Sequence, residues 1–331
     1  MSPAPSSVPS APAQQIPLID LSLPPLQIRR AIQSACKDWG FFYLTNHGLP
    51  AASVHKLWEV TRTFFALPLE EKAAAGPWNG AENAGYRPVL PKVPKEQFDT
   101  RKWLAPPLAG VEAYQQPLPP YLEENRAFLD AFKRECAALG VRVLGYLEEG
   151  LGVEEGYFAQ RHKYEEPSMD NFELMHYIPY TPEYAEKDVF RLGAHTDWGS
   201  LTLLFQESQP GLQVRPPTYD HASLPTASET WIDAPVVQDA VLVNVGDAMH
   251  IWSGGSVRST WHRVSKGGES DRYCAAYFLH PNERSVIDPL PTATSSYIRE
   301  KYPGFPKTAK QHLHDRVREA VQQQNSALYV G

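Results

Sequence analysis

Two histidines and one aspartate in the second half of the chain have the residue types and spacing of a metal site. His195 and Asp197 are separated by one residue, so on an extended segment their side chains project to the same side. His262 follows later in the same β-rich half of the sequence. If the strands that carry them pack together, two imidazoles and one carboxylate can meet around a single ion.

The composition of this ligand set indicates which metal it would hold. Two histidines and one carboxylate leave three coordination positions open, which is the arrangement of non-haem Fe(II) oxygenases. A closed zinc site usually has a fourth protein ligand, often cysteine. No cysteine lies close to His195, Asp197 or His262 in the sequence. The pattern therefore predicts a redox-active iron site.

Arg272 is predicted to bring an anion-binding group to the same site. The glycines at 267–268 indicate a tight turn, so we expect a hairpin that places position 262 roughly opposite position 272. Because side chains alternate along a strand, Arg272, Cys274 and Ala276 would share the face of His262. A buried guanidinium needs an anionic partner. A dicarboxylate could chelate the metal at one end and pair with the arginine at the other.

The elements that must position these residues change in type along the chain. Helical periodicity dominates before residue 170, and short β-rich runs separated by turn residues follow it. Short strands at such spacing are typical of a sandwich or barrel. We expect helices at about 26–38, 51–66, 120–150 and 308–324, and strands at about 16–21, 39–45, 171–178, 200–206, 211–215, 240–245, 261–265 and 272–279.

The stretch 76–119 is rich in proline and glycine, and we interpret it as a long irregular segment, which is usually either a functional lid or a disordered segment. The sequence predicts five parts. They are a disordered tail at 1–15, an N-terminal region at 16–120, a helical connection at 121–170, a core at 171–285 and a C-terminal helical segment at 286–331.

The composition argues against several classes of protein. The 331 residues include 31 Lys and Arg against 38 Asp and Glu, a formal net charge of −7. A chain this acidic, without a basic block, is a poor candidate for binding nucleic acid or an anionic membrane. There is no apolar run long enough to span a membrane and no secretion signal, and three scattered cysteines do not make a disulfide framework. We expect a cytoplasmic monomer or weak homodimer that acts on a small molecule.

The sequence resembles the Fe(II)- and 2-oxoglutarate-dependent dioxygenases, in the branch that includes isopenicillin N synthase, over about residues 16–285. The resembling motifs occur in the order of the family: Ile16-Pro-Leu-Ile-Asp20, Trp39-Gly-Phe-Phe-Tyr-Leu-Thr-Asn-His-Gly48, Gly85-Tyr86, His195-Thr-Asp197, Gly211-Leu-Gln-Val214, Val243-Asn-Val-Gly-Asp247 and His262-Arg-Val264. The resemblance implies a mainly β fold with flanking helices. Its core would be a distorted double-stranded β-helix, or jelly roll, with an α/β N-terminal region.

The resemblance also implies roles for individual residues. The three predicted metal-binding residues match the iron ligands of the family. Arg272 matches the arginine that binds the distal carboxylate of 2-oxoglutarate, and Tyr177 is the match for a tyrosine that reaches the same carboxylate. The family usually has serine two residues after the arginine, whereas this chain has Cys274, and a thiol is a weaker donor than a hydroxyl.

The implied activity is oxidation of a C–H bond in a small organic molecule, typically a natural product, with release of succinate and CO₂. The outcome would be hydroxylation, desaturation or ring formation. Fe(II) would be the cofactor, 2-oxoglutarate and O₂ the cosubstrates, and ascorbate a stimulant. The aromatic residues that could line a substrate pocket are Trp198, Tyr86, Trp103, Trp78 and Phe98.

Two other functions remain open on the sequence alone. An iron-dependent oxidase of the same fold need not use 2-oxoglutarate, because Arg272 could bind another carboxylate. A non-catalytic binding protein could also have kept the fold. The complete set of three metal-binding residues argues against this second possibility, since loss of a ligand is the simplest route to a binding protein.

Overall fold

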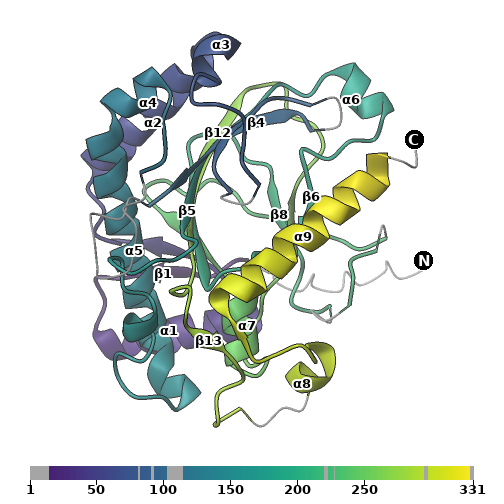
Figure 1. Cartoon of the computed structure of the whole chain (residues 1–331). Coiled ribbons are helices and arrows are strands. Elements are labelled where there is room, and N and C mark those ends of the chain that lie inside the picture. The colour runs from purple at the N-terminus through teal and green to yellow at the C-terminus, as the bar shows by residue number, and fades with distance from the viewer. Residues whose placement is uncertain are drawn as a thin grey trace, which may run out of the picture.

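The computed structural model describes residues 15–80, 83–90, 93–102, 115–219, 223–226, 228–293 and 297–328. Two β-sheets enclose a cavity, and helices cover the outer face of the larger sheet (Figure 1). This arrangement confirms the mainly β fold with flanking helices. The predicted disordered tail lies outside the described residues, apart from residue 15.

The larger sheet has eight strands whose spatial neighbours are mostly distant in sequence, as in a jelly roll. All of its pairings are antiparallel except the first. In spatial order the strands are β1 (Leu18–Asp20), β2 (Phe41–Thr45), β10 (Val241–Val245), β7 (Leu201–Gln206), β12 (Arg272–Leu279), β5 (Asn171–Tyr177), β4 (Lys95–Arg101) and β3 (Gly85–Arg87).

The smaller sheet closes the other side of the cavity. Its strands are β6 (Leu192–His195), β11 (His262–Val264), β8 (Leu212–Val214) and β9 (Ile232–Asp233), in that spatial order. A separate pair, β13 (Val286–Ile287) and β14 (Lys307–Thr308), lies near the C-terminal helices.

Long amphipathic helices bury their apolar stripes against the outer face of the larger sheet. In α5 (Arg126–Glu148) the ring of Phe132 lies 5.7 Å from that of Phe172 on β5 and 5.2 Å from that of Phe205 on β7. Burial of such large apolar side chains is the main stabilising contribution to the fold. The helices beside it are α1 (Pro25–Asp38), α2 (Ala51–Ala66), α3 (Leu69–Lys72) and α4 (Pro120–Glu124).

The C-terminal helix α9 (Ala309–Leu328) follows β14 and lies on the side of the molecule away from the other long helices (Figure 1). The remaining helices are short: α6 (Pro182–Glu186), α7 (Asp247–Trp252) and α8 (Tyr297–Lys301). No helix in the described part of the chain is both long enough and apolar enough to cross a membrane.

The expected hairpin between positions 262 and 272 is wrong. Strand β11 pairs with β6 and β8, whereas β12 pairs with β5 and β7. The glycines at 267–268 do mark a change of direction, and both have a positive φ, but the chain passes there from one sheet to the other. A turn signal in the sequence does not determine which sheet the next strand joins.

The interpretation of 76–119 as irregular throughout is also wrong. Strands β3 and β4 lie within it and extend the larger sheet beyond β5. Residues 103–114 are outside the described residues, so the predicted lid is described only in part.

Candidate metal centre and active site

The two sheets bring His195, Asp197 and His262 together in the wall of the cavity. His195 ends β6 and lies directly opposite His262, the first residue of β11. One ligand atom from each of the three side chains lies within 4.8 Å of the others. Oδ1 of Asp197 is 3.6 Å from Nε2 of His262 and 3.8 Å from Nε2 of His195. Among the described residues this is the only such group of three or more histidine, cysteine or acidic side chains.

Backbone carbonyl groups orient both imidazoles. Nδ1 of His195 lies 2.9 Å from the carbonyl oxygen of Gly193, and Nδ1 of His262 lies 3.1 Å from that of Thr260. A carbonyl oxygen can only accept a hydrogen bond, so each Nδ1 carries the proton. Each Nε2 is then left with a lone pair for a metal.

The carboxylate of Asp197 is held from two other strands. Its Oδ2 accepts hydrogen bonds from Thr202 on β7 and from Asn244 on β10, the latter at 2.7 Å. Burial alone would raise the pKa of Asp197, but His262, His195 and these hydrogen bonds outweigh it and lower the pKa. The carboxylate is therefore ionised, with Oδ1 free to face an ion.

The imidazole of His195 is biased toward the neutral form that binds metals. Burial, followed by the nearby His262, lowers its pKa to about 4. A neutral imidazole is the form that coordinates an ion, so His195 needs no deprotonation step at neutral pH.

Arg272 lines the same cavity. Its side chain is 1% exposed and lies with its guanidinium 4.9 Å from the ring centre of Tyr177. It donates hydrogen bonds to Gln209, Gln206 and Cys274, none of which is charged. No carboxylate among the described residues pairs with it. A guanidinium this buried is costly without an anion, so the geometry fits a carboxylate-bearing ligand.

The other residues at the Arg272 end of the cavity are Tyr177, Cys274 and Lys95. Tyr177 lies opposite Arg272 on β12 and opposite Lys95 on β4. The Cys274 sulfur accepts a hydrogen bond from Arg272 at 3.3 Å. Lys95, which no sequence motif indicated, lines the cavity as a second cation, and burial lowers its pKa. Two cations at one end suit a dianion such as 2-oxoglutarate.

The opposite end of β5 is polar and was not predicted. Every second residue on the inner face of β5 lines the cavity. Counted back from Tyr177, these residues are Met175, Glu173 and Asn171. Across from Glu173 on β4 lies Asp99, which is fully buried. Alternation along a strand would have indicated Glu173 and Asn171 once the strand was known.

The predicted aromatic pocket is only partly present. Trp198 lines the cavity. Phe98 and Tyr86 are buried among the apolar side chains of the main core instead, with the ring of Phe64 5.3 Å and 6.4 Å away. Trp78 stacks against the guanidinium of Arg87 at 3.8 Å and does not line the cavity. The remaining aromatic candidate, Trp103, lies outside the described residues.

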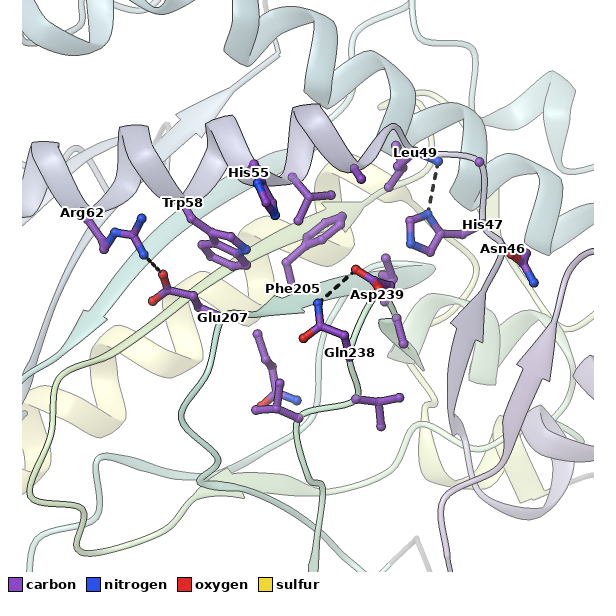
Figure 2. Close-up of a pocket in the computed structure, with 18 residues that line it drawn as sticks. Asn46, His47, Leu49, His55, Trp58, Arg62, Phe205, Glu207, Gln238 and Asp239 are labelled. Carbon is purple, nitrogen blue, oxygen red and sulfur yellow. Dashed lines mark hydrogen bonds and ion pairs between the residues drawn. The ribbon is translucent and has the colours of Figure 1, made fainter.

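A second, larger cavity of about 700 Å³ lies between α2 and the segment 236–241 (Figure 2). Its polar groups are largely satisfied by one another. Arg62 pairs with Glu207, and His47 accepts the backbone N–H of Leu49 at 3.2 Å. It has no group of metal ligands among the described residues. The smaller cavity, of about 270 Å³, is therefore the candidate active site.

Comparison with known proteins agrees with this site. Residues 16–105 match the family described as the N-terminal region of a non-haem dioxygenase in morphine synthesis, and residues 169–281 match the 2OG-Fe(II) oxygenase superfamily. The 2-oxoglutarate-dependent dioxygenase tropC of Talaromyces stipitatus is 33% identical over 78% of this chain and 81% of its own length. Flavonol synthase/flavanone 3-hydroxylase of Arabidopsis thaliana is 31% identical over 89% of this chain and 84% of its own.

A solved structure extends the likeness to three dimensions. A full-length Neurospora crassa protein, crystallised in complex with α-ketoglutarate and 5-formyluracil, is 28% identical with a TM-score of 0.75, over 91% of this chain and 95% of that one. The chain therefore belongs to the 2OG-Fe(II) oxygenase superfamily, in its isopenicillin N synthase-like branch. It is an enzyme that uses Fe(II), 2-oxoglutarate and O₂.

Proposed function

We propose that His195, Asp197 and His262 hold the iron and that Arg272 binds the distal carboxylate of 2-oxoglutarate. One observation carries this assignment. The three ligands and a buried arginine without a carboxylate partner line a single cavity, from opposite sheets. A dicarboxylate there would reach the metal with one end and neutralise the arginine with the other.

The protein's own residues position the reactants and limit access of water. Bound iron supplies the activation of O₂ and of the substrate C–H bond. Arg272, Tyr177 and Cys274 would fix the cosubstrate at its distal end. Helix α9 covers the cavity, since Leu313 lines it and Nε2 of His312 hydrogen-bonds the carbonyl oxygen of Trp198 at 3.1 Å.

The substrate we propose is a small organic molecule, of the natural-product kind, that is oxidised at a C–H bond. The relatives support a substrate of this size. The name of the Arabidopsis enzyme contains flavanone, and a second structure of the Neurospora protein, at 25% identity, is a complex with thymine. A cavity of about 270 Å³ is slightly below the usual range for drug-sized ligands. Hydroxylation, desaturation and ring formation all begin with the same hydrogen abstraction.

The experiment is a measurement of succinate release with Fe(II), 2-oxoglutarate and ascorbate, with and without thymine or a flavanone. We expect succinate release that a substrate stimulates and that Arg272→Ala removes. His55→Ala, at an exposed histidine outside the site, serves as the control and should behave as wild type. Product formed without 2-oxoglutarate would instead identify an oxidase, and a protein that takes up no metal would be a binding protein.

We further propose that the enzyme is a cytoplasmic monomer or weak homodimer without a nucleic-acid partner. The net charge of −7 supports the last point. All three cysteines are buried and unpaired, as is usual in a reducing compartment. Light scattering on the purified protein would test the oligomeric state.

A further inference from the structure

The end of the cavity away from Arg272 is formed by paired polar side chains on adjacent strands. Glu173 on β5 lies opposite Asp99 on β4, and Asn171 lies one inward-facing position further along β5. Successive inward-facing residues on a strand are about 6–7 Å apart. Glu173 is therefore roughly 13 Å along the strand from Tyr177, clear of the anion-binding end.

The carboxyl group of Glu173 is buried beside that of Asp99. Burial, followed by the nearby Asp99, raises the pKa of Glu173 to about 8. Asp99 accepts hydrogen bonds from Gln97 at 3.0 Å and from Arg87 at 3.1 Å. With a pKa of about 8, Glu173 is mostly protonated at neutral pH, and its carbonyl oxygen can accept a hydrogen bond.

Asn171 supplies an acceptor that nothing in the described structure uses. Its Nδ2 donates to Asp99 at 3.3 Å and to Glu173 at 3.4 Å, which fixes the amide orientation. Its Oδ1 is buried without a hydrogen-bond partner, in a residue that is 2% exposed and lines the cavity. An unpaired buried acceptor is costly, so a group that enters the cavity is expected to donate to it.

The charges around this end favour a neutral donor. Arg87 pairs with Asp99, and Lys95, whose Nζ lies 5.6 Å from the ring centre of Tyr177, is close enough to Glu173 for the two charges to interact. A cationic amine would lie close to both of these cations, whereas an anion would lie beside the acidic side chains of Glu173 and Asp99. An amide N–H avoids both conflicts, and its neighbouring carbonyl group can accept a hydrogen bond from Lys95.

From this arrangement we propose that the substrate is a small neutral cyclic amide whose N–H group binds at Asn171 and Glu173. The inference rests on the proposed function, because it assumes that 2-oxoglutarate occupies the Arg272 end. The cavity volume of about 270 Å³, shared with the cosubstrate, leaves room for about one ring. Asn171 and Glu173 then determine specificity by accepting hydrogen bonds that an N-substituted molecule cannot donate.

The test is calorimetric binding to the Fe(II)-loaded enzyme with 2-oxoglutarate, without O₂. The probes are thymine, succinimide and δ-valerolactam, each compared with its fully N-methylated counterpart. We expect at least one N–H compound to bind at least tenfold more tightly than its N-methylated form, because the acceptors are left unpaired in the second complex. Asn171→Leu and Glu173→Leu should each remove that preference. Glu173→Gln, which imitates the protonated carboxyl group, should keep it.

The affinity for 2-oxoglutarate, measured in the same proteins, is the control for folding and for the proposed function. It should stay within about twofold in all three variants, because Arg272 lies at the other end of the cavity. A wild-type protein that binds no 2-oxoglutarate would contradict the proposed function itself. Two results, obtained together with normal 2-oxoglutarate binding, would overturn the cyclic-amide inference alone. The first is that no probe binds more tightly than its N-methylated form. The second is that Asn171→Leu keeps the preference for the N–H compound.

Discussion

At the scale of single residues, the site depends on hydrogen bonds made by the atoms that face away from the metal. Gly193 and Thr260 fix the proton on Nδ1 of the two imidazoles, and Asn244 holds the far oxygen of Asp197. Such contacts determine the tautomer and orientation of each ligand before an ion arrives. The three ligand atoms are therefore preorganised, and loss of any one of them leaves an incomplete site.

The first prediction concerns the metal ligands. His195→Ala, Asp197→Ala and His262→Ala should each weaken Fe(II) binding by more than about 100-fold, because even changes to residues behind a ligand commonly cost 10- to 100-fold. Equilibrium dialysis with an iron assay measures this directly. His55→Ala should bind one Fe(II) per chain like wild type. A variant of the three that kept full affinity would not be a ligand.

The second prediction concerns the anion-binding end. Arg272→Ala should weaken 2-oxoglutarate binding by about 100-fold or more, since removal of one partner of a buried charge pair costs about 3–5 kcal/mol. Arg272→Lys should recover only part of the loss, because an ammonium group cannot form the bidentate contact. Cys274→Ser should be mild or should tighten binding by about 0.5–1.5 kcal/mol through a stronger hydrogen-bonding group.

Calorimetry with Fe(II)-saturated protein separates these effects from metal loss. The affinity for Fe(II) should be nearly the same in all three variants. Unchanged affinity for 2-oxoglutarate in Arg272→Ala would place the anion site elsewhere in the chain.

At the scale of the elements, the loop after β6 depends on close backbone packing. A Cβ at Gly246 would lie 2.2 Å from the carbonyl oxygen of Gly199 and 3.2 Å from that of Asp197. The next residue, Asp247, donates its N–H to the Asp197 carbonyl oxygen at 2.8 Å. The glycine thus lets the start of α7 support the segment that carries Asp197.

Gly246→Ala should therefore destabilise the fold by about 1–3 kcal/mol, as overpacking typically does, and should also weaken Fe(II) binding. Gly145→Ala is the matched control, since a Cβ there meets nothing within 4 Å on the exposed side of α5. It should stabilise the protein by about 0.5–1 kcal/mol. Chemical denaturation measures both, and a Gly246→Ala protein as stable as wild type would refute the packing argument.

Much of the fold could be predicted from the sequence, because its long helices and core strands bury regular apolar patterns. The polar strand β4 could not, since Lys95 and Gln97, which line the cavity, and Asp99 on the same face interrupt that pattern. The same alternation turns Phe98 toward the core, so an aromatic residue in a polar segment was a poor indicator of a substrate pocket. The sheet that each strand joins also could not be predicted, because it depends on long-range pairing.

The residues of the site also differ in whether the sequence indicates them. The residues with a fixed chemical role, such as His195 and Asp197, have motifs that can be recognised. Glu173 and Asn171 belong to no motif, because they are specified by the strand face on which they lie.

At the scale of the whole molecule, the free energy of unfolding should depend on pH through Glu173. The folded-state pKa of Glu173 is raised from 4.5 to about 8, so the folded state binds the extra proton between these values. This contribution to stability is complete below about 4.5 and is lost as the pH rises through about 8.

The measurement compares the free energy of unfolding of two proteins, wild type and Glu173→Gln, across a range of pH. The free energy of unfolding of wild type, minus that of Glu173→Gln, should fall as the pH rises from about 5 to about 8, because Gln cannot titrate. The neutral buried histidines His162 and His280, whose pKa burial lowers to about 4, destabilise both proteins equally at acid pH and cancel. A difference that does not change with pH would show that the pKa of Glu173 is not raised in the folded protein.

The most direct test of the whole account is a crystal structure grown without O₂ from protein, Fe(II) and 2-oxoglutarate, with anomalous data collected at the iron edge. We predict an iron peak between Nε2 of His195, Nε2 of His262 and Oδ1 of Asp197, with the distal carboxylate of 2-oxoglutarate on the guanidinium of Arg272. An iron peak away from these three atoms, or 2-oxoglutarate bound without contact to Arg272, would contradict the account.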